Sequence, residues 1–536
     1  MKSENGTKPS LKSSKEAKGS VTPEEEAAGH WLCEDGPYLD YITSLCGSNP
    51  GLKQRDPANK DHPLRVGQAV VYLLDSPANG PPDFQNTQFR DAKDLKRYFN
   101  GTSDNHDRRR IYIMEGLAQD YVAVIGGHFF MDPSFFQRQE RTCVWSNEFT
   151  PTSDALPQPS LLNPKKSFHL QYCELRQFET IMKNEPFFCH RTGRHVGMTP
   201  PRHAEESTTG ILRRKVSWWC RTTTGGGWDV VILCDPQLDD LWNPQKKEKT
   251  KPGKNRAFQN GYVDFLCPQD PARVLSKPQH PHKSMLIDLC HYIEHHADLI
   301  PEEQWNDPHT SSFFLKKIVA AHYLQLIDYI KAMLPSLELR LTTAWVEEQD
   351  QWKSLQTISR RCGNYRDDIE DTLLSLGYPL KDLESSNAIG DWMDDKLDFQ
   401  YIYFRLKILK QRADNLMQAM TGLASIAGNR QNLEEAKRVK RLNLLALLFI
   451  PLAYTSSLFS MSEKFAPGAG KFWIYWVSAI LALAVTFLTT YILDTALGDD
   501  AQWRIPFKFW GEKEDKTKPK PKRTGTGFFD KSVYRG

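Results

Sequence analysis

The sequence predicts a cytosolic domain of α+β or α/β class, followed by long stalk helices and a two-helix transmembrane hairpin. Residues 31–335 are mixed, with strand-like runs, turn signals and helical stretches, and residues 336–441 are helical in pattern. Two uncharged apolar stretches follow, Leu442–Met461 and Phe472–Leu493. A helix of about 20 residues crosses the hydrocarbon core of a bilayer, so each stretch is long enough to span one.

The bulk composition fits a chain of several structural units that is mostly water-soluble. The chain has 536 residues and a formal net charge of +3, with a mean hydropathy of −0.55. Two or three units are expected at this length, and the nearly balanced charge gives no indication of a nucleic-acid partner. The ten cysteines, from Cys33 to Cys362, include no Cys-x-x-Cys pair. We therefore expect free, buried thiols in a reducing compartment.

Residues 1–30 predict a disordered N-terminal arm. This stretch has several lysines together with Glu24, Glu25 and Glu26, and it contains no apolar run. A signal peptide needs an apolar segment and a mitochondrial presequence avoids acids, so neither is expected. A solvated, charged segment of this kind does not bury enough apolar surface to fold.

Residues 31–335 predict the cytosolic α/β domain. The β-branched runs Val66–Asp75 and Arg109–Leu117 indicate buried strands. A turn is expected at Gly126-Gly127 between two short helices, and Asp132 followed by Pro133 is a good start signal for the second helix.

Two further segments of this domain predict a hairpin and a loop. The segment Lys215–Asp235 predicts two strands around a turn at Gly225–Gly227. A glycine triplet also occurs in phosphate-binding loops, but neither a Lys-Ser/Thr pair nor a helix follows here. The segment Asn243–Arg256 predicts a basic surface loop.

Helical periodicity dominates from about Lys283 onward. One helix is expected to end at Pro335, and a longer helical region is expected from Leu337, with a break around Gly377–Pro379. The pattern then becomes a heptad seam, which predicts packing against partner helices. Its apolar positions are Phe399, Ile402, Leu406, Leu409, Ala413, Leu416, Met420, Leu423 and Ala427.

The motif His291-x-x-Glu294-His295 is an alternative with a different chemistry, because it matches a zinc-peptidase signature. Two histidines four residues apart on a helix can share a metal ion. The apolar stripe of this helix, however, places both histidines on the solvated side, and no third ligand stands out. The chain is therefore not expected to be an enzyme.

The predicted hairpin consists of spans at residues 442–461 and 472–493, joined by an external loop at 462–471. Trp473, Tyr475 and Trp476 cluster at one end of the second span, as interfacial aromatic residues do. Basic residues precede the first span and fill the tail at 494–536, so both termini are expected in the cytosol. The plasma membrane is expected because no presequence is seen. The stretch Lys513–Arg523 binds anionic lipid or serves only as a topology signal.

Two spans enclose no pore by themselves, so a conducting protein of this kind must form a homo-oligomer. The region around the spans has a long helix ending in a basic cluster, then Pro451-Leu452, then Phe465 and Pro467 in the loop, and an aromatic-rich second span. With these features it resembles the CorA-type magnesium transporter family, particularly its divergent fungal-like members. It implies a pentamer with a funnel-shaped cytosolic domain, in which Mg²⁺ is transported or regulatory.

The resemblance also assigns residues to the pore. Those implied to line it are Val439, Leu442, Ile450, Ala453 and Ser457, and the family's Gly-Met-Asn motif falls on Ser460, Met461 and Ser462. Only Met461 of that motif is kept. A ring of Asn amides can accept hydrogen bonds from hydrated Mg²⁺, whereas a Ser hydroxyl has a shorter reach and rotates freely. Where the family often has an acid after the loop proline, this chain has Gly468.

Two functions therefore remain open. In one, the protein is a passive channel for Mg²⁺ or another divalent cation, with Leu442 and Ile450 as apolar constrictions. In the other, it is a non-conducting CorA-like scaffold or regulatory subunit. Family members sense cytosolic Mg²⁺ with acidic residues, but none of the acids here matches a family position, and a solvated helix face is the alternative. These acids are Asp367, Asp368, Glu370, Asp371, Asp394, Asp395 and Asp398.

Overall fold

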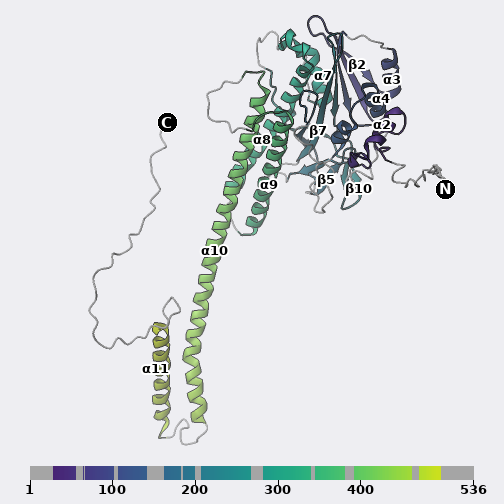
Figure 1. The fold of residues 1–536 in the computed structure, drawn as a ribbon. Coiled ribbons are helices and arrows are strands. Elements are labelled where there is room, and N and C mark those ends of the chain that lie inside the picture. The colour runs from purple at the N-terminus through teal and green to yellow at the C-terminus, as the bar shows by residue number, and fades with distance from the viewer. Residues whose placement is uncertain are drawn as a thin grey trace, which may run out of the picture. The chain divides into compact units, whose positions relative to one another are not determined.

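The computed structural model describes residues 28–55, 64, 67–101, 107–141, 162–182, 185–199, 207–266, 282–339, 345–380, 391–460 and 470–496. The chain divides into two compact units, residues 1–420 and 421–536 (Figure 1). The predicted arm up to residue 27, residues 461–469 of the predicted span end and loop, and the basic tail from residue 497 lie outside the described residues. The domain boundaries expected from the sequence stay predictions.

The core of the first unit is a mixed sheet. Its described strands form an 11-stranded sheet in the order β10-β9-β5-β6-β7-β8-β3-β1-β2, with β4 pairing to β7 and β11 to β4. The β3–β8 pair is parallel and the other pairs are antiparallel. The strands are β1 Val70–Pro77, β2 Gln85–Phe89, β3 Arg108–Glu115, β4 Ser167–Phe178, β5 Pro186–Cys189, β6 His195–Met198, β7 Thr208–Thr222, β8 Trp228–Cys234, β9 Leu241–Asn243, β10 Glu248–Thr250 and β11 Asn255–Ala257.

Helices cover both faces of this sheet (Figure 1). Along β3, Ile111 and Ile113 join one hydrophobic cluster while Tyr112 and Met114 join another, because successive side chains of a strand point to opposite faces. Helices α2 to α5 pack on the second face and α7 to α10 on the first. Their bounds are α2 Pro37–Leu45, α3 Ala92–Gly101, α4 Gln119–Phe129, α5 Pro133–Glu140, α7 Met285–His296, α8 Phe313–Leu339, α9 Trp345–Ser375 and α10 Asp395–Ser460.

Short 3₁₀ helices connect several of these elements. They are η1 Pro50–Leu52, η4 Phe258–Asn260, η5 Ala297–Leu299, η6 Glu302–Asn306 and η7 Pro308–Ser312. The last three link α7 to α8. Trp305 in η6 is fully buried, and its backbone carbonyl accepts a hydrogen bond from Trp228 Nε1 at 2.8 Å. The connection is therefore part of the core rather than a surface loop.

The strands and the hairpin predicted from local patterns are confirmed. Val66–Asp75 and Arg109–Leu117 overlap β1 and β3, and β7 and β8 form the predicted hairpin with Gly226 at φ 85° in its turn. The prediction of a loop at Asn243–Arg256 is wrong, because β10 pairs with β9 inside that segment. The side chains of β10 are nevertheless exposed, which is why the composition resembles that of a loop.

The predicted turn at Gly126-Gly127 is wrong. Helix α4 runs through both glycines, and the chain turns at Phe130, which has φ 50°. A Cβ at Gly126 would collide with the ring of Tyr38, so the glycine serves close packing between α2 and α4. The restart at Asp132 is confirmed, since its carboxylate accepts a hydrogen bond from Ser134 N at 2.9 Å as α5 begins.

The predicted helix end at Pro335 is also wrong. Helix α8 continues through Pro335 to Leu339, and α9 starts at Trp345 rather than near Leu337. Leu334 and Leu337, on either side of the proline, are both buried in the core. Keeping both there favours a continuous helix over a break. The predicted break near Gly377 is confirmed, since α9 ends at Ser375 and Gly377 has φ 72°.

Candidate ion pathway on helix α10

The residues implied to line a pore lie on one face of α10. Helix α10 runs for 66 residues, and its part from Thr421 to Ser460 belongs to the second unit. At about 100° per residue, the candidate positions fall within a sector of about 80°. We call this sector the predicted pore face; it consists of Val439, Leu442, Ile450, Ala453, Ser457 and Ser460. Met461 and Ser462, the other two motif positions, lie outside the described residues.

All six side chains of the predicted pore face are exposed. Leu442 and Ile450 have 65% and 68% of their surface accessible. Burying a branched apolar side chain is favourable by about 1.5–3 kcal/mol. We therefore expect these exposed side chains to be shielded from water in the assembled protein. Lipid, another copy of the chain or a narrow apolar pore can each provide this shielding.

Helix α11, Phe472–Ala496, packs on the opposite side of α10. The rings of Phe459 and Tyr475 meet edge to face at 5.9 Å. Thr455 on α10 and Ala479 on α11 are 6% and 1% exposed. At about 100° per residue, Phe459, Thr455 and the buried Pro451 centre about 180° from the predicted pore face. The second helix therefore contacts the back of the first near its C-terminal end, at Pro451, Thr455 and Phe459, and it does not contact the predicted pore face.

Helix α10 is continuous through Pro451. A proline has no N–H, so one hydrogen bond of the helix is missing at this point. The hydroxyl of Thr455 donates within the helix to the carbonyls of Pro451 and Leu452, each at 3.0 Å. The polar side chain on the buried face thus finds its partners inside its own helix, as an apolar environment requires.

Both apolar helices have the length and composition of membrane spans. Their most apolar windows have mean hydropathies of 1.8 and 1.9, and only 11% and 6% of those windows is buried. A core helix of a soluble protein would be mostly buried. Exposed large apolar residues cover α11 from Trp473 to Ile492.

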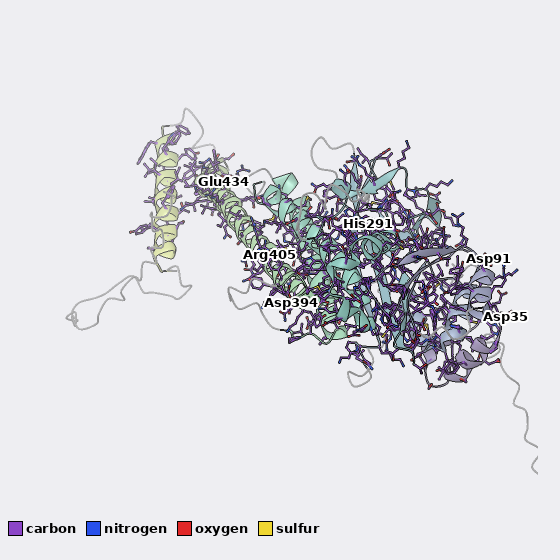
Figure 2. The ribbon with its side chains drawn as sticks, turned by 90° about the horizontal axis from the view of Figure 1, so that it is seen from above. Asp35, Asp91, His291, Asp394, Arg405 and Glu434 are labelled. Atoms are coloured by element: carbon purple, nitrogen blue, oxygen red, sulfur yellow. The ribbon has the colours of Figure 1, made fainter. Side chains whose placement is uncertain are left out.

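Two polar residues extend the predicted pore face and were missed by the sequence reasoning. Asn432 and Glu435 fall in the same sector, two turns and one turn before Val439. Both are exposed, and Glu435 Oε1 accepts a hydrogen bond from Gln431 Nε2 at 3.3 Å. Glu434, the neighbouring acid, falls on the other side of the helix (Figure 2 labels it). Extending the helical spacing toward the N-terminus would have found both.

The acids near the start of α10 are held by bases of the same chain. Lys316 Nζ lies 2.9 Å from Asp395, and Lys317 Nζ lies 2.6 Å from Asp398. Lys316 is only 4% exposed and also donates to Tyr378 Oη at 3.1 Å. Burial raises the pKa of Asp398, while Lys317 opposes that rise. These carboxylates stabilise the attachment of α10 to α8 and are not arranged as metal ligands.

Acids of α9 and of the α9–α10 connection are likewise paired with groups of the same chain. Asp368 lies 3.6 Å from Arg213 of β7, and burial raises its pKa to about 6 although Arg213 acts in the opposite direction. Asp367 pairs with Arg366 at 2.7 Å. Asp394, labelled in Figure 2, accepts a hydrogen bond from Leu397 N at 3.1 Å at the start of α10.

The histidine motif on α7 does not form a metal centre. The rings of His291 and His295 stack at 4.8 Å, and His295 Nδ1 lies 3.0 Å from the carbonyl of His291 (Figure 2 labels His291). Both histidines are half-buried, so the expectation that they lie on a solvated side is only partly met. Within the part of the chain that the structure describes, no three His, Cys, Asp or Glu side chains are grouped to hold a metal ion.

Comparison with known proteins indicates a family for one part of the chain. Residues 298–494 match the family model described as CorA-like Mg2+ transporter protein. This part of the chain belongs to the CorA-like family. The CorA-like region begins before α8, contains α9 and all of α10, and ends within α11, so both candidate spans lie inside it. The expected resemblance is confirmed for this region.

Two solved structures resemble this chain at low similarity. One is the CorA magnesium transporter from Methanocaldococcus jannaschii, with 8% identity, a TM-score of 0.32 and coverage of 78% of this chain and 96% of that one. The other is the full-length CmaX protein, with 11% identity, a TM-score of 0.34 and coverage of 79% and 97%. At such scores neither likeness supports a conclusion about this chain. The comparison with curated proteins found no match.

Proposed function

We propose that the chain is a homo-oligomeric channel for divalent cations, with Mg²⁺ as its first candidate ion. The observation that carries this proposal is the arrangement of the hairpin. Helix α11 contacts one side of α10 near its C-terminal end, and the exposed residues of the predicted pore face lie on the other side. Several copies arranged around an axis, a pentamer by the family resemblance, would bring these faces together.

Each part of the predicted pore face has a chemical role in this proposal. Leu442 and Ile450 form apolar rings that close the path by dewetting, and the hydroxyls of Ser457 and Ser460 contact hydrated cations. Met461 and Ser462 complete the mouth. Glu435 adds a carboxylate per copy before the first apolar ring, which concentrates cations there. Hydrated Mg²⁺ releases water reluctantly, so acceptors that bind its water shell suit it.

The proposed topology places both termini in the cytosol and the loop at 462–471 outside, in the plasma membrane. Transport is passive and driven by the membrane potential, which contributes about 2.3 kcal/mol per charge per 100 mV. A divalent cation gains twice that energy. The large first unit would then be cytosolic, in keeping with its free buried cysteines, which are Cys33, Cys46, Cys173, Cys189, Cys220, Cys234, Cys290 and Cys362.

A non-conducting scaffold or regulatory subunit is the second candidate. The observation in its favour is that only Met461 of the Gly-Met-Asn motif is kept. The test is Mg²⁺, Co²⁺ and Ni²⁺ flux into vesicles that contain the purified full-length chain. Flux of any of these ions supports the channel. Stable oligomers without flux under any gradient support the scaffold.

The substitution Ser462→Asn tests the assignment of the filter. We expect a higher Mg²⁺ flux, because the amide restores the long acceptor that the family motif has at this position. Ser456→Asn is the matched control, since Ser456 is exposed on α10 but lies outside the predicted pore face. If the Ser462→Asn variant assembles correctly and conducts as the parent does, the result would argue against the filter assignment.

A further inference from the structure

The five residues before the first candidate span have an unusual order on the helix. Their sequence is Lys437-Arg438-Val439-Lys440-Arg441, so four basic residues surround one apolar residue. At about 100° per residue, the basic side chains occupy an arc of about 160° centred opposite Val439. The one uncharged position of the five is the one on the predicted pore face. We call these four basic residues the basic collar.

The collar lies on the same side of α10 as the contact with α11. Counted at about 100° per residue, the centre of its arc has the same angular position around the helix as Thr455 and Phe459, which lie on the side of the second helix. This side of the hairpin faces away from the predicted pore. Positive charge placed there does not face cations that pass along the other side, and the four side chains stay exposed on the side that carries α11.

The collar also lies at the depth of lipid headgroups. With a rise of about 1.5 Å per residue, its four residues lie within about 8 Å of Leu442 along the helix axis. The polar layer on each side of the hydrocarbon core is about 5–8 Å thick. If the apolar stretch starting at Leu442 spans the core, the four cationic side chains lie among the phosphates of the cytosolic leaflet.

The four side chains are available for a ligand. All of them are exposed, and among the described residues none of the four forms an ion pair with a carboxylate. Glu434 lies one turn before Arg438, yet the two form no salt bridge in the described structure. An Arg guanidinium binds a phosphate through two parallel hydrogen bonds, and a Lys ammonium binds it as a point charge.

We propose that Lys437, Arg438, Lys440 and Arg441 form a binding collar for anionic phospholipid headgroups at the cytosolic leaflet. The proposal rests on the hairpin spanning a membrane, but it does not depend on ion conduction. The simpler account is that these residues only set the topology. A topology signal depends on the number of positive charges near a span, whereas lipid binding also depends on the side of the helix that carries them.

The test measures which lipids stay bound to the purified full-length chain. The chain is equilibrated in mixed micelles of phosphatidylcholine and phosphatidylglycerol, and the ratio of anionic to neutral lipid retained is determined by native mass spectrometry. Each basic residue near an anionic surface strengthens binding about fivefold. We therefore expect the variant with Lys437, Arg438, Lys440 and Arg441 all changed to Gln to lose at least about tenfold in this ratio.

A charge-matched variant separates the collar from a topology signal. The double change Val439→Lys with Lys440→Val keeps four basic residues in the segment but moves one to the predicted pore face. We expect it to retain less anionic lipid than the parent and more than the fourfold Gln variant. The preference of the parent should also weaken at high salt, because exposed charges are screened.

Three results would contradict the proposal that the basic collar binds anionic lipid. One is an unchanged lipid ratio in the fourfold Gln variant. Another is a parent-like ratio in the charge-matched variant, which would leave only a topology signal. The third is displacement of the lipid by inorganic phosphate, which would mean that the site binds free anions. Ion flux is measured separately, so that loss of conduction with intact lipid retention counts against the channel and not against the collar.

Discussion

The two parts of helix α10 follow one apolar pattern but meet different surroundings. In the first unit, the seam residues Phe399, Ile402 and Leu406 are fully buried against the α/β domain. In the second unit, the seam residue Leu423 is 48% exposed. Within the described residues, the seam positions are therefore buried only up to about Met420. Beyond Met420, lipid or other copies of the chain would have to cover the seam residues. The predictions below test this difference between the buried and the exposed part of the seam.

The largest effect is expected at the buried end of the seam. Phe399→Ala removes a ring that is 0% exposed and should lower the free energy of unfolding by about 3–5 kcal/mol. Denaturation of the detergent-solubilised full chain, followed by a signal of the first unit, measures this loss. A cost below about 1 kcal/mol would mean that α10 is not held by this seam.

A somewhat smaller effect is expected at the ion pair that holds the start of α10. Lys316→Gln removes a side chain that is 4% exposed and leaves Asp395 without its cation. Breaking a buried pair costs about 3 kcal/mol. The matched control is Lys410→Gln, whose pair with Asp414 is one-third exposed and should cost about 0.5 kcal/mol or less. Equal losses of stability in the two variants would contradict a stabilising role for the buried ion pair between Lys316 and Asp395.

The next effect depends on pH and concerns Asp368 on α9. Burial raises its pKa from 3.8 to about 6 in the folded protein. A carboxyl with a raised folded pKa stabilises the fold at low pH, and this contribution is lost as pH rises through about 6. The stability difference between the parent and Asp368→Asn should therefore favour the parent more at pH 5 than at pH 7. Melting curves at both pH values measure it, and the opposite order would refute the assignment.

The smallest effect on the first unit is expected at the exposed end of the seam. Leu423→Ala should change the free energy of unfolding of that unit by no more than about 0.5 kcal/mol. If copies of the chain cover Leu423, the fraction of oligomer should fall instead, which light scattering of the purified protein measures. A large loss of stability in the first unit would show that both parts of the helix have partners inside one chain.

Local patterns predicted much of the fold. The strands β1 and β3, the β7–β8 hairpin and the seam of α10 all follow from short periodicities. The parallel pairing of β3 with β8 could not be predicted, because it joins segments such as Ile111 and Val230 that are far apart in sequence. The course of α4 through Gly126 depends on Tyr38 from another helix, so the glycine alone indicated a turn that does not exist.

The candidate site was predictable only in part. Spacing places the predicted pore face on one side of α10, and the same spacing would have added Asn432 and Glu435. The side covered by α11 could not be predicted, because α11 is apolar all around and indicates no preferred face. The ion pairs of Asp395 and Asp398 with Lys316 and Lys317 could not be predicted either, since they depend on the packing of α8 against α10.

The burial of the cysteines has a practical consequence for mapping the predicted pore face. Burial raises the pKa of Cys33 to about 11 and of Cys173, Cys220 and Cys362 to about 12, so these thiols form little of the thiolate that maleimides attack. No cysteine occurs after Cys362, and Cys143 and Cys267 lie outside the described residues. A cysteine introduced at Ser457 would be the sole thiol of the hairpin, and its labelling from each side of a vesicle would report where water reaches the helix.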